Sequence, residues 1–164
     1  MQKTQLTQPV KINNTHSFST HTTWHLTHPK PLTPKAIIGR CAENLVCYHL
    51  LQTGWQIRER NYASHEGEID IIAEKMHEDL KGYPTIAFIE VKSRSTDKGL
   101  SPALSVSTSK QKKLARMRKL WIGKHPREKA VYRFDIATVI LKKFRPPKLT
   151  WYRNAFVPHE EFGW

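Results

Sequence analysis

The alternation of apolar and polar residues is clearest between residues 67 and 92. Two β-branched, apolar runs lie there, over residues 67–73 and 85–92, and the segment between them contains Gly82 and Pro84. Apolar runs of this length, separated by turn residues, predict the two strands of one hairpin. Because the second run is almost continuously apolar, we expect it to be an inner strand of the sheet.

Charged residues interrupt the first strand of this hairpin. Side chains along a strand alternate between the two faces of the sheet. The alternation places Glu68 and Asp70 on one face with Ile72, and it places Ile69 and Ile71 on the other. The first strand therefore carries its acidic residues on a single predicted face.

The second strand carries Glu90, Lys92 and Arg94 on one predicted face, opposite Ile89 and Val91. A charge in an inner strand is costly unless it is paired or bound to a metal ion. The pattern therefore indicates a functional cluster formed by neighbouring strands. The alternative is that these charges form the solvated face of an antiparallel sheet, and the pattern alone does not decide between the two.

The segment before the hairpin predicts a helix from Pro34 to about Gln52. Thr33 is a favourable N-cap, proline suits the first helical position, and Gly54 ends the helix. Apolar residues at helical spacing form two stripes, so we expect a largely buried helix. The stripes are Ile37, Cys41, Leu45 and Tyr48, and Glu43, Val46, Cys47 and Leu50.

Glu43 is the charged member of the second stripe. Two interpretations remain open. In one, Glu43 is a helix-surface residue that pairs with Arg40 or His49. In the other, its carboxylate points toward the charged hairpin and takes part in a site.

The remaining chain predicts one further helix, three strands and two loops. We expect strands over 56–62, 132–141 and 149–156, a polar loop over 61–67 and a charged loop over 95–102. The helix is expected to run from Ser107 or Thr108 to near Gly123, and its inward residues are Leu114, Met117, Leu120 and Trp121. The order α-β-β-β-α-β-β indicates an α/β fold, with a central mixed sheet flanked by helices. Residues 34–164 are expected to form a single domain.

The predicted second helix is strongly basic. Six basic residues within ten positions favour a stripe that faces phosphate groups, although a solvated surface has the same pattern. These residues are Lys110, Lys112, Lys113, Arg116, Arg118 and Lys119.

The charge of the whole chain points in the same direction. The 164 residues include 27 lysines and arginines but only 14 acidic residues, which gives a net charge of +13. Such an excess is typical of proteins that bind nucleic acid, and it also occurs in proteins that bind anionic membranes. No run of 18 apolar residues occurs, so we expect no membrane-spanning segment.

The cysteines and the N-terminal sequence favour a cytoplasmic protein. Cys41 and Cys47 are six residues apart on one predicted helix, about 9 Å along its axis, which is too far for a disulfide. They are more typical of small core residues than of a metal pair. The N-terminus lacks the apolar core of a signal peptide.

Residues 1–33 have a different composition from the rest of the chain. They hold eight threonines, four histidines and three prolines but no acidic residue, which predicts a disordered tail. His21, His25 and His28 have helical spacing that could form a metal site. The threonines and Trp24 around them make a helix unfavourable, so we expect no such site.

Several short motifs together resemble one known family. This set resembles the YraN-like family of small bacterial proteins over about residues 36–157, and that family is similar to the PD-(D/E)xK, or restriction-endonuclease-like, nucleases. Within them the pattern is closest to archaeal Holliday junction resolvases. The motifs are Gly39-x3-Glu43, Arg60-Asn61, Gly67-Glu68-Ile69-Asp70, Glu90-Val91-Lys92-x-Arg94, Gly99-x2-Pro102, Lys110-Gln111, Arg133-Phe134-Asp135 and Asn154-Ala155-Phe156.

The resemblance implies a central mixed sheet flanked by helices and metal-dependent phosphodiester cleavage. Asp70 and Glu90, with the main-chain carbonyl of Val91, would hold Mg²⁺ or Mn²⁺, which prefer oxygen ligands. Lys92 would orient the attacking water, and Glu43 matches the helix carboxylate of the resolvases. Lys110 or Gln111 matches their polar residue on the second helix.

Three classes of function follow from these observations. The first is a metal-dependent endonuclease with catalytic residues Glu43, Asp70, Glu90 and Lys92. The second is a non-catalytic nucleic-acid-binding protein that keeps the nuclease fold, and the third is an interaction protein with an incidental basic surface. We expect nucleic acid as the partner, with DNA favoured over RNA, and analogy with the resolvases allows a homodimer. The expected nucleic-acid-binding residues are Arg94, Lys110, Gln111, Lys112, Lys113 and Arg116.

Overall fold

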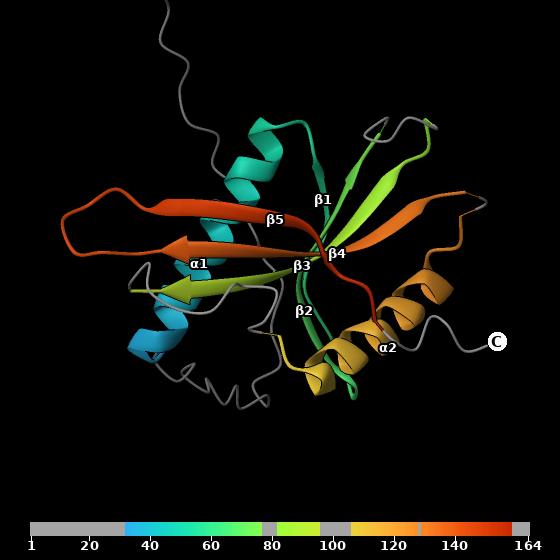
Figure 1. Cartoon of the computed structure of the whole chain (residues 1–164), viewed down its shortest axis with the longest axis horizontal. Coiled ribbons are helices and arrows are strands. Elements are labelled where there is room, and N and C mark those ends of the chain that lie inside the picture. Colours follow the sequence, from blue (N-terminus) through green and yellow to red (C-terminus); the bar gives the residue numbers. More distant parts are fainter. Residues whose placement is uncertain (1–31, 77–81, 96–105, 128, 159–164) are drawn as a thin grey trace, which may run out of the picture. The chain divides into compact units, whose positions relative to one another are not determined.

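The described residues of the computed structural model form a five-stranded sheet with one helix on each face (Figure 1). These residues are 32–76, 82–95, 106–127 and 129–158. The expected order of elements and α/β fold class are confirmed. The elements are α1 (Pro34–Gln52), β1 (Gln56–Ser64), β2 (Gly67–Lys75), β3 (Thr85–Arg94), α2 (Thr108–Lys124), β4 (Val131–Ile140) and β5 (Lys148–Phe156).

Two sequence expectations fall mostly on residues outside this description. The predicted tail, residues 1–33, lies outside the described residues except for Leu32 and Thr33. The tail histidines, where we expect no metal site, lie outside them as well. Most of the charged loop expected over 95–102 is outside them too.

The sheet has the strand order β1-β2-β3-β4-β5. β3 and β4 run parallel, and the other neighbouring strands are antiparallel. β3 is the central strand, and its residues from Thr85 to Glu90 are all buried. This confirms the inner strand that the apolar run predicted.

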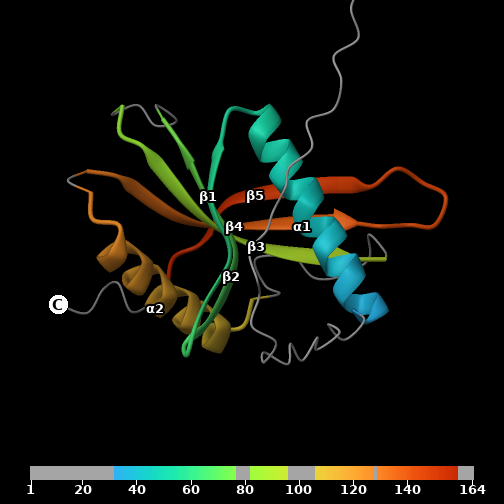
Figure 2. The ribbon, with the colours of Figure 1, turned by 180° about the vertical axis from the view of Figure 1, so that it is seen from behind.

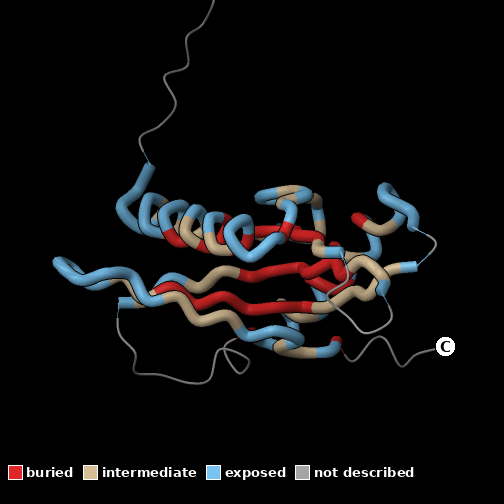
Figure 3. The backbone as a smooth tube through the Cα atoms, turned by 90° about the horizontal axis from the view of Figure 1, so that it is seen from above, coloured by how far each residue is buried: buried red, intermediate tan, exposed pale blue. Residues whose placement is uncertain are grey.

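The two helices pack on opposite faces of the sheet, which gives three layers (Figures 2 and 3). On one face, Val46 and Leu50 of α1 pack with Ile89 of β3. On the other face, Met117 and Trp121 of α2 pack with apolar residues of β2, β3 and β4. Neither helix among the described residues is long and apolar enough to cross a membrane.

The ends of α1 are where the sequence placed them. The Thr33 hydroxyl accepts a hydrogen bond from the main-chain N–H of Ala36 at 3.2 Å. Gly54, just past the helix, has φ of 81°, a conformation that glycine adopts without steric cost. Ser107 caps α2 in the same way as Thr33, by accepting from the N–H of Lys110.

The expectation that α1 is largely buried was wrong. Ile37 and Tyr48 of the first stripe are 49% and 65% exposed, and Cys41 is also exposed. The sheet covers only the side of the helix that carries Val46 and Leu50. In α2, Leu120 is similarly 37% exposed rather than inward.

The side chains of β2 do not alternate as the sequence predicted. Ile69 and Ile72 both pack in the cluster beneath α2, whereas Ile71 packs in the cluster beneath α1. Asn61, which lies opposite Asp70 in the β1–β2 register, has φ of 51°. The two-residue period is interrupted between Ile69 and Ile71, opposite this left-handed residue.

A buried aspartate joins β4 to β5. Asp135 is fully buried and accepts hydrogen bonds from Arg133 Nε at 3.0 Å, Trp151 Nε1 at 3.0 Å and the N–H of Asn154 at 2.8 Å. Burial raises the pKa of Asp135, and the charge of Arg133 opposes that rise. The register of the two strands shifts beside this residue, so its side chain supplies contacts where the regular ladder is interrupted.

Candidate functional site

β2 and β3 separate at the point where their charged residues begin. The register of the pair runs from Lys75 and Thr85 to Ile71 and Ile89. Just beyond it, Asp70 Oδ2 accepts a hydrogen bond of 2.6 Å from the N–H of Val91. The Asp70 side chain thus takes the place of a main-chain acceptor for Val91 where the β2–β3 hydrogen-bond ladder ends, and the two strands separate there. We call Asp70, Glu90, Lys92 and Lys110 the fork site.

Glu90 lies between two lysines of the fork site. It is 5% exposed, and its Oε1 accepts a hydrogen bond of 2.8 Å from Lys92 Nζ. Lys110, in the first turn of α2, places its Nζ 3.2 Å from Glu90 Oε2. That Oε2 is buried and accepts no hydrogen bond with proper geometry from the described residues. The expected common face of Glu90 and Lys92 is therefore confirmed.

The surroundings of Asp70 disfavour the charged form of its carboxyl group. Burial raises its pKa from 3.8 to about 7, and the charge of Glu90 adds to this, with a smaller contribution from Glu43. The hydrogen bond from Val91 and the charge of Lys110 oppose the rise. Two carboxylates held together in a poorly solvated place repel each other. A pKa perturbed by burial and a specific neighbour is typical of functional sites.

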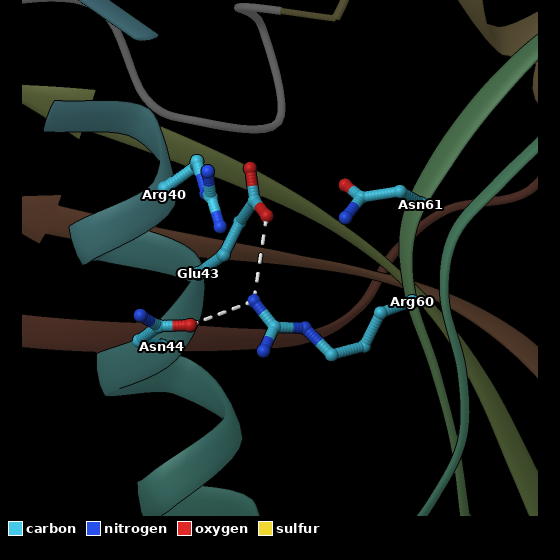
Figure 4. A pocket seen from close by; sticks show the side chains of 5 residues that line it. All are labelled: Arg40, Glu43, Asn44, Arg60 and Asn61. Atoms are coloured by element: carbon cyan, nitrogen blue, oxygen red, sulfur yellow. Dashed lines mark hydrogen bonds and ion pairs between the residues drawn. The ribbon is translucent and has the colours of Figure 1, made fainter. Parts of the chain in front are cut away.

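Glu43 approaches the fork site from α1. Its Oε2 lies 3.6 Å from Arg60 Nη2, which also donates a hydrogen bond of 2.8 Å to Asn44 Oδ1 (Figure 4). These three residues, with Arg40 and Asn61, line a pocket of about 490 Å³. The partner of Glu43 is neither Arg40 nor His49, and a role for its carboxylate in a site stays a prediction. Glu43 forms an ion pair with Arg60 instead, and its charge also reaches Asp70.

The two candidates for the polar residue of α2 take different directions. Lys110 reaches Glu90, whereas Gln111 Nε2 donates a hydrogen bond of 3.0 Å to the carbonyl of Val106. Gln111 thus helps to hold the start of α2. Further along the helix, Lys112, Lys113, Arg116 and Lys119 are exposed, and Arg116 bonds to Glu66.

Comparison with known proteins assigns the family. Residues 42–139 match the family described as "Uncharacterised protein family UPF0102". The chain belongs to this family. A UPF0102 protein of Trichlorobacter lovleyi is 34% identical over 119 residues, which are 73% of this chain and 89% of the relative. One of Chloroherpeton thalassium is 35% identical over 118 residues, 72% of this chain and 81% of the relative.

A UPF0102 protein of Caldicellulosiruptor bescii is 35% identical over 121 residues, which cover 73% of this chain and 96% of the relative. These matches confirm the resemblance to the YraN-like family, which belongs to the restriction-endonuclease-like superfamily. The mixed sheet between two helices is consistent with the core of that superfamily. The names of the relatives give the family and no activity.

Arg60 of this UPF0102 chain pairs with Glu43, a contact that the sequence did not predict. The motif Arg60-Asn61 formed part of the resemblance, but nothing in its spacing linked it to Glu43. The structure shows the link through the strand register, in which Arg60 pairs with Ile71, next to Asp70. The expected hairpin of β2 and β3 did not include β1, so this link was missed.

The oxygen atoms of the fork site fit a hard divalent cation. Asp70 and Glu90 supply two carboxylates at the fork, and their mutual repulsion would be relieved by a positive charge. The described residues contain no cluster of three or more His, Cys, Asp or Glu side chains that could hold a metal ion. Mg²⁺ commonly uses one or two carboxylates and keeps several waters, so two carboxylates suffice.

Proposed function

We propose that this UPF0102 chain hydrolyses phosphodiester bonds in nucleic acid with the help of Mg²⁺ or Mn²⁺. The observation that carries the proposal is the position of two carboxylates where β2 and β3 separate: Asp70 accepts from the N–H of Val91, and Glu90 is buried. Burial and the charge of Glu90 raise the pKa of Asp70. Lys92 lies on the same face as Glu90 and within hydrogen-bond distance of it. A carboxylate pair can hold the cation that assists phosphodiester hydrolysis, and an adjacent lysine can stabilise the developing negative charge.

Each residue of the fork site has a role in this proposal. Asp70, Glu90 and the main-chain carbonyl of Val91 would hold the cation. The bound cation would supply positive charge to the scissile phosphate and lower the pKa of a water molecule. Lys92 would orient that water and stabilise the negative charge of the transition state.

Glu43 and Lys110 support these groups from the two helices. Glu43 would accept a hydrogen bond from a water molecule on the α1 side of the fork site. Lys110 already reaches Glu90 at 3.2 Å and reduces the repulsion between Glu90 and Asp70. Arg60 holds Glu43 through its ion pair and so acts as a positioning residue.

The basic residues of α2 would contact the phosphate backbone. We expect DNA rather than RNA as the substrate, and a homodimer would suit a branched one. Phosphate contacts give affinity without sequence preference. Arg94 follows Lys92 along β3 and is the nearest basic residue of the same strand.

We expect that replacing Lys112, Lys113 and Arg116 together by glutamine weakens binding to every nucleic acid alike. Each lost phosphate contact should lower the slope of log K against log salt by about 0.9. Fluorescence anisotropy at several salt concentrations measures both effects. A matched control replaces Lys75 and Lys129, at the other end of the sheet, by glutamine. An unchanged salt slope in the triple variant would assign the stripe to solvent.

A cleavage assay tests the proposed function. Labelled duplex, single-stranded, flap and four-way substrates are incubated with Mg²⁺, with Mn²⁺ or with EDTA. We expect cleavage of at least one substrate with metal and none with EDTA, and the Glu90→Gln variant should be inactive. Intact substrates under all conditions, with protein that binds them, would contradict the proposal.

A second candidate function rests on the contacts of Glu90. Its carboxylate already has two lysines, Lys92 and Lys110, close to its two oxygens. A non-catalytic nucleic-acid-binding protein with the same fold would have such pairs. The two candidate functions differ in their response to divalent metal, because only the nuclease needs a cation to offset the repulsion between Asp70 and Glu90.

A further inference from the structure

The turn between β4 and β5 carries an exposed aromatic ring among basic side chains. Phe144 is 92% exposed. Its neighbours in the sequence are Lys142, Lys143 and Arg145. Two prolines and then Lys148 come after Arg145. We call residues 142–148 the hairpin tip. A single exposed apolar residue is common, so the ring becomes informative only together with its conformation and its place.

The backbone at Phe144 adopts a conformation that is unfavourable for a bulky residue. The N–H of Arg145 donates to the carbonyl of Lys142, so Phe144 is the third residue of a four-residue turn. Its φ is 58°, where glycine or asparagine is usually found. Pro146 and Pro147 follow and restrict the chain further. Strain of this kind, kept at an exposed position, suggests a function for the side chain.

The hairpin tip lies at the same end of the sheet as the fork site. Lys92 is paired with Thr138 and Arg94 with Ile140, and the N–H of Leu141 donates to the carbonyl of Arg94. The hairpin continues past the end of β3 in both views (Figures 1 and 2). At about 3.3 Å per residue, Phe144 extends at most about 20 Å beyond the level of Lys92. That distance is about six nucleotides along a strand of a duplex.

The segment around the hairpin tip carries only positive charge. No acidic residue occurs from residue 136 to residue 159, and five basic residues do. Lys143 Nζ lies 4.9 Å from the centroid of the Phe144 ring, so a cation and the ring are presented together. Aromatic rings interleaved with basic groups bind single-stranded nucleic acid, because the cations contact phosphates and the rings stack on bases.

We infer that the hairpin tip binds the nucleic acid strand next to the fork site and that Phe144 stacks on an unpaired or unstacked base. The identification of the ligand as nucleic acid rests on the proposed function. In an intact duplex the faces of the bases are covered by their neighbours, so the ring finds a partner only where stacking is interrupted. The hairpin tip therefore selects single-stranded or interrupted substrates. An anionic membrane would also accept a basic, aromatic tip, but the fork site beside it favours nucleic acid.

Binding measured without metal tests this inference. Fluorescein-labelled single-stranded and blunt duplex oligonucleotides are titrated in EDTA and followed by anisotropy. A single-stranded oligonucleotide that contains 2-aminopurine reports stacking by a loss of fluorescence. The variants are Phe144→Ala, Phe144→Gly and Phe144→Trp. Tyr48→Ala is the matched control, because Tyr48 is 65% exposed on α1.

We expect Phe144→Ala to weaken binding of the single strand about ten-fold and to abolish the 2-aminopurine signal. Binding of the blunt duplex should change by less than about two-fold, because phosphate contacts remain. Phe144→Trp should keep the single-strand affinity, and Tyr48→Ala should change nothing. Phe144→Gly should bind like Phe144→Ala without a lower melting temperature, since glycine suits φ of 58°.

Three results would overturn the inference. The first is single-strand affinity that does not respond to Phe144→Ala, and the second is an equal loss on single strand and duplex. The third is binding to phosphatidylserine vesicles that depends on Phe144 while no nucleic acid responds. The proposed function can fail separately. A protein that binds single strands through Phe144 but never cleaves them would support the hairpin tip and contradict the nuclease.

Discussion

Replacing Lys92 by methionine should reduce cleavage by about 100- to 1000-fold, which is the loss observed when one donor to a developing negative charge is removed. Methionine has a similar length but carries no charge and no donor. Lys110 still faces Glu90 at 3.2 Å in this variant, so the acid keeps a cationic neighbour. We therefore expect little change in stability, and Mn²⁺ binding should remain. Single-turnover cleavage measures the rate directly.

The matched control for this change is Lys75→Met. Lys75 lies at the other end of β2, where its Nζ donates to the carbonyl of Thr53. The Lys75→Met variant should cleave at the rate of the parent. Equal rates for the parent and Lys92→Met would remove Lys92 from the mechanism. A general loss of melting temperature in Lys92→Met would instead show that the lysine is a structural partner of Glu90.

Replacing Asp70 by asparagine should stabilise the metal-free protein at pH 8. The rise of the pKa from 3.8 to about 7 corresponds to about 4 kcal/mol as an upper bound. Solvent screening at this half-buried position reduces the effect, and we expect about 1–2 kcal/mol. Asparagine can still accept the hydrogen bond from Val91, so the change removes charge and keeps the contact. Thermal melts in EDTA measure the difference.

The advantage of the Asp70→Asn variant should depend on pH with a definite sign. Because folding raises the pKa of Asp70, the folded protein holds the proton more tightly than the unfolded chain does. The parent therefore loses stability as pH rises from about 4 to about 7, and the variant does not. The two proteins should melt alike near pH 4 and differ most at pH 8. A variant less stable than the parent at both pH values would identify Asp70 as a salt-bridge partner.

Most of the fold followed from local signals in the sequence. Thr33 and Ser107 marked the starts of the two helices, and Gly54 marked the end of the first, because each satisfies a main-chain requirement that few residues meet. The apolar run of β3 predicted its central place. Such signals depend only on neighbouring residues, so one sequence is enough to read them.

The failures came from features that depend on distant contacts. The apolar stripe of Ile37 and Tyr48 looked like a core face, but helical spacing does not say whether another element covers it. The alternation in β2 is interrupted around Asp70, opposite Asn61 of another strand, which has a left-handed conformation. No pattern within β2 itself predicts this interruption.

The same distinction separates the predicted and unpredicted parts of the site. The sequence placed Asp70, Glu90 and Lys92 on adjacent strands, and the structure brings them together at the fork. The pairing of Glu43 with Arg60 required the position of α1 relative to β1, which the sequence does not give. For the hairpin tip the sequence predicted only the two flanking strands, because the exposure and the φ of Phe144 are three-dimensional properties.

Calorimetric titration with Mn²⁺ tests most directly whether Asp70 and Glu90 share a cation. We expect saturable heat in the parent at about one ion per chain, and its loss in both Asp70→Asn and Glu90→Gln, because each variant removes one ligand charge. Lys92→Met should keep the heat. The absence of Mn²⁺ binding in the parent, or unchanged binding in Asp70→Asn, would contradict a metal-dependent nuclease and favour the non-catalytic binding protein.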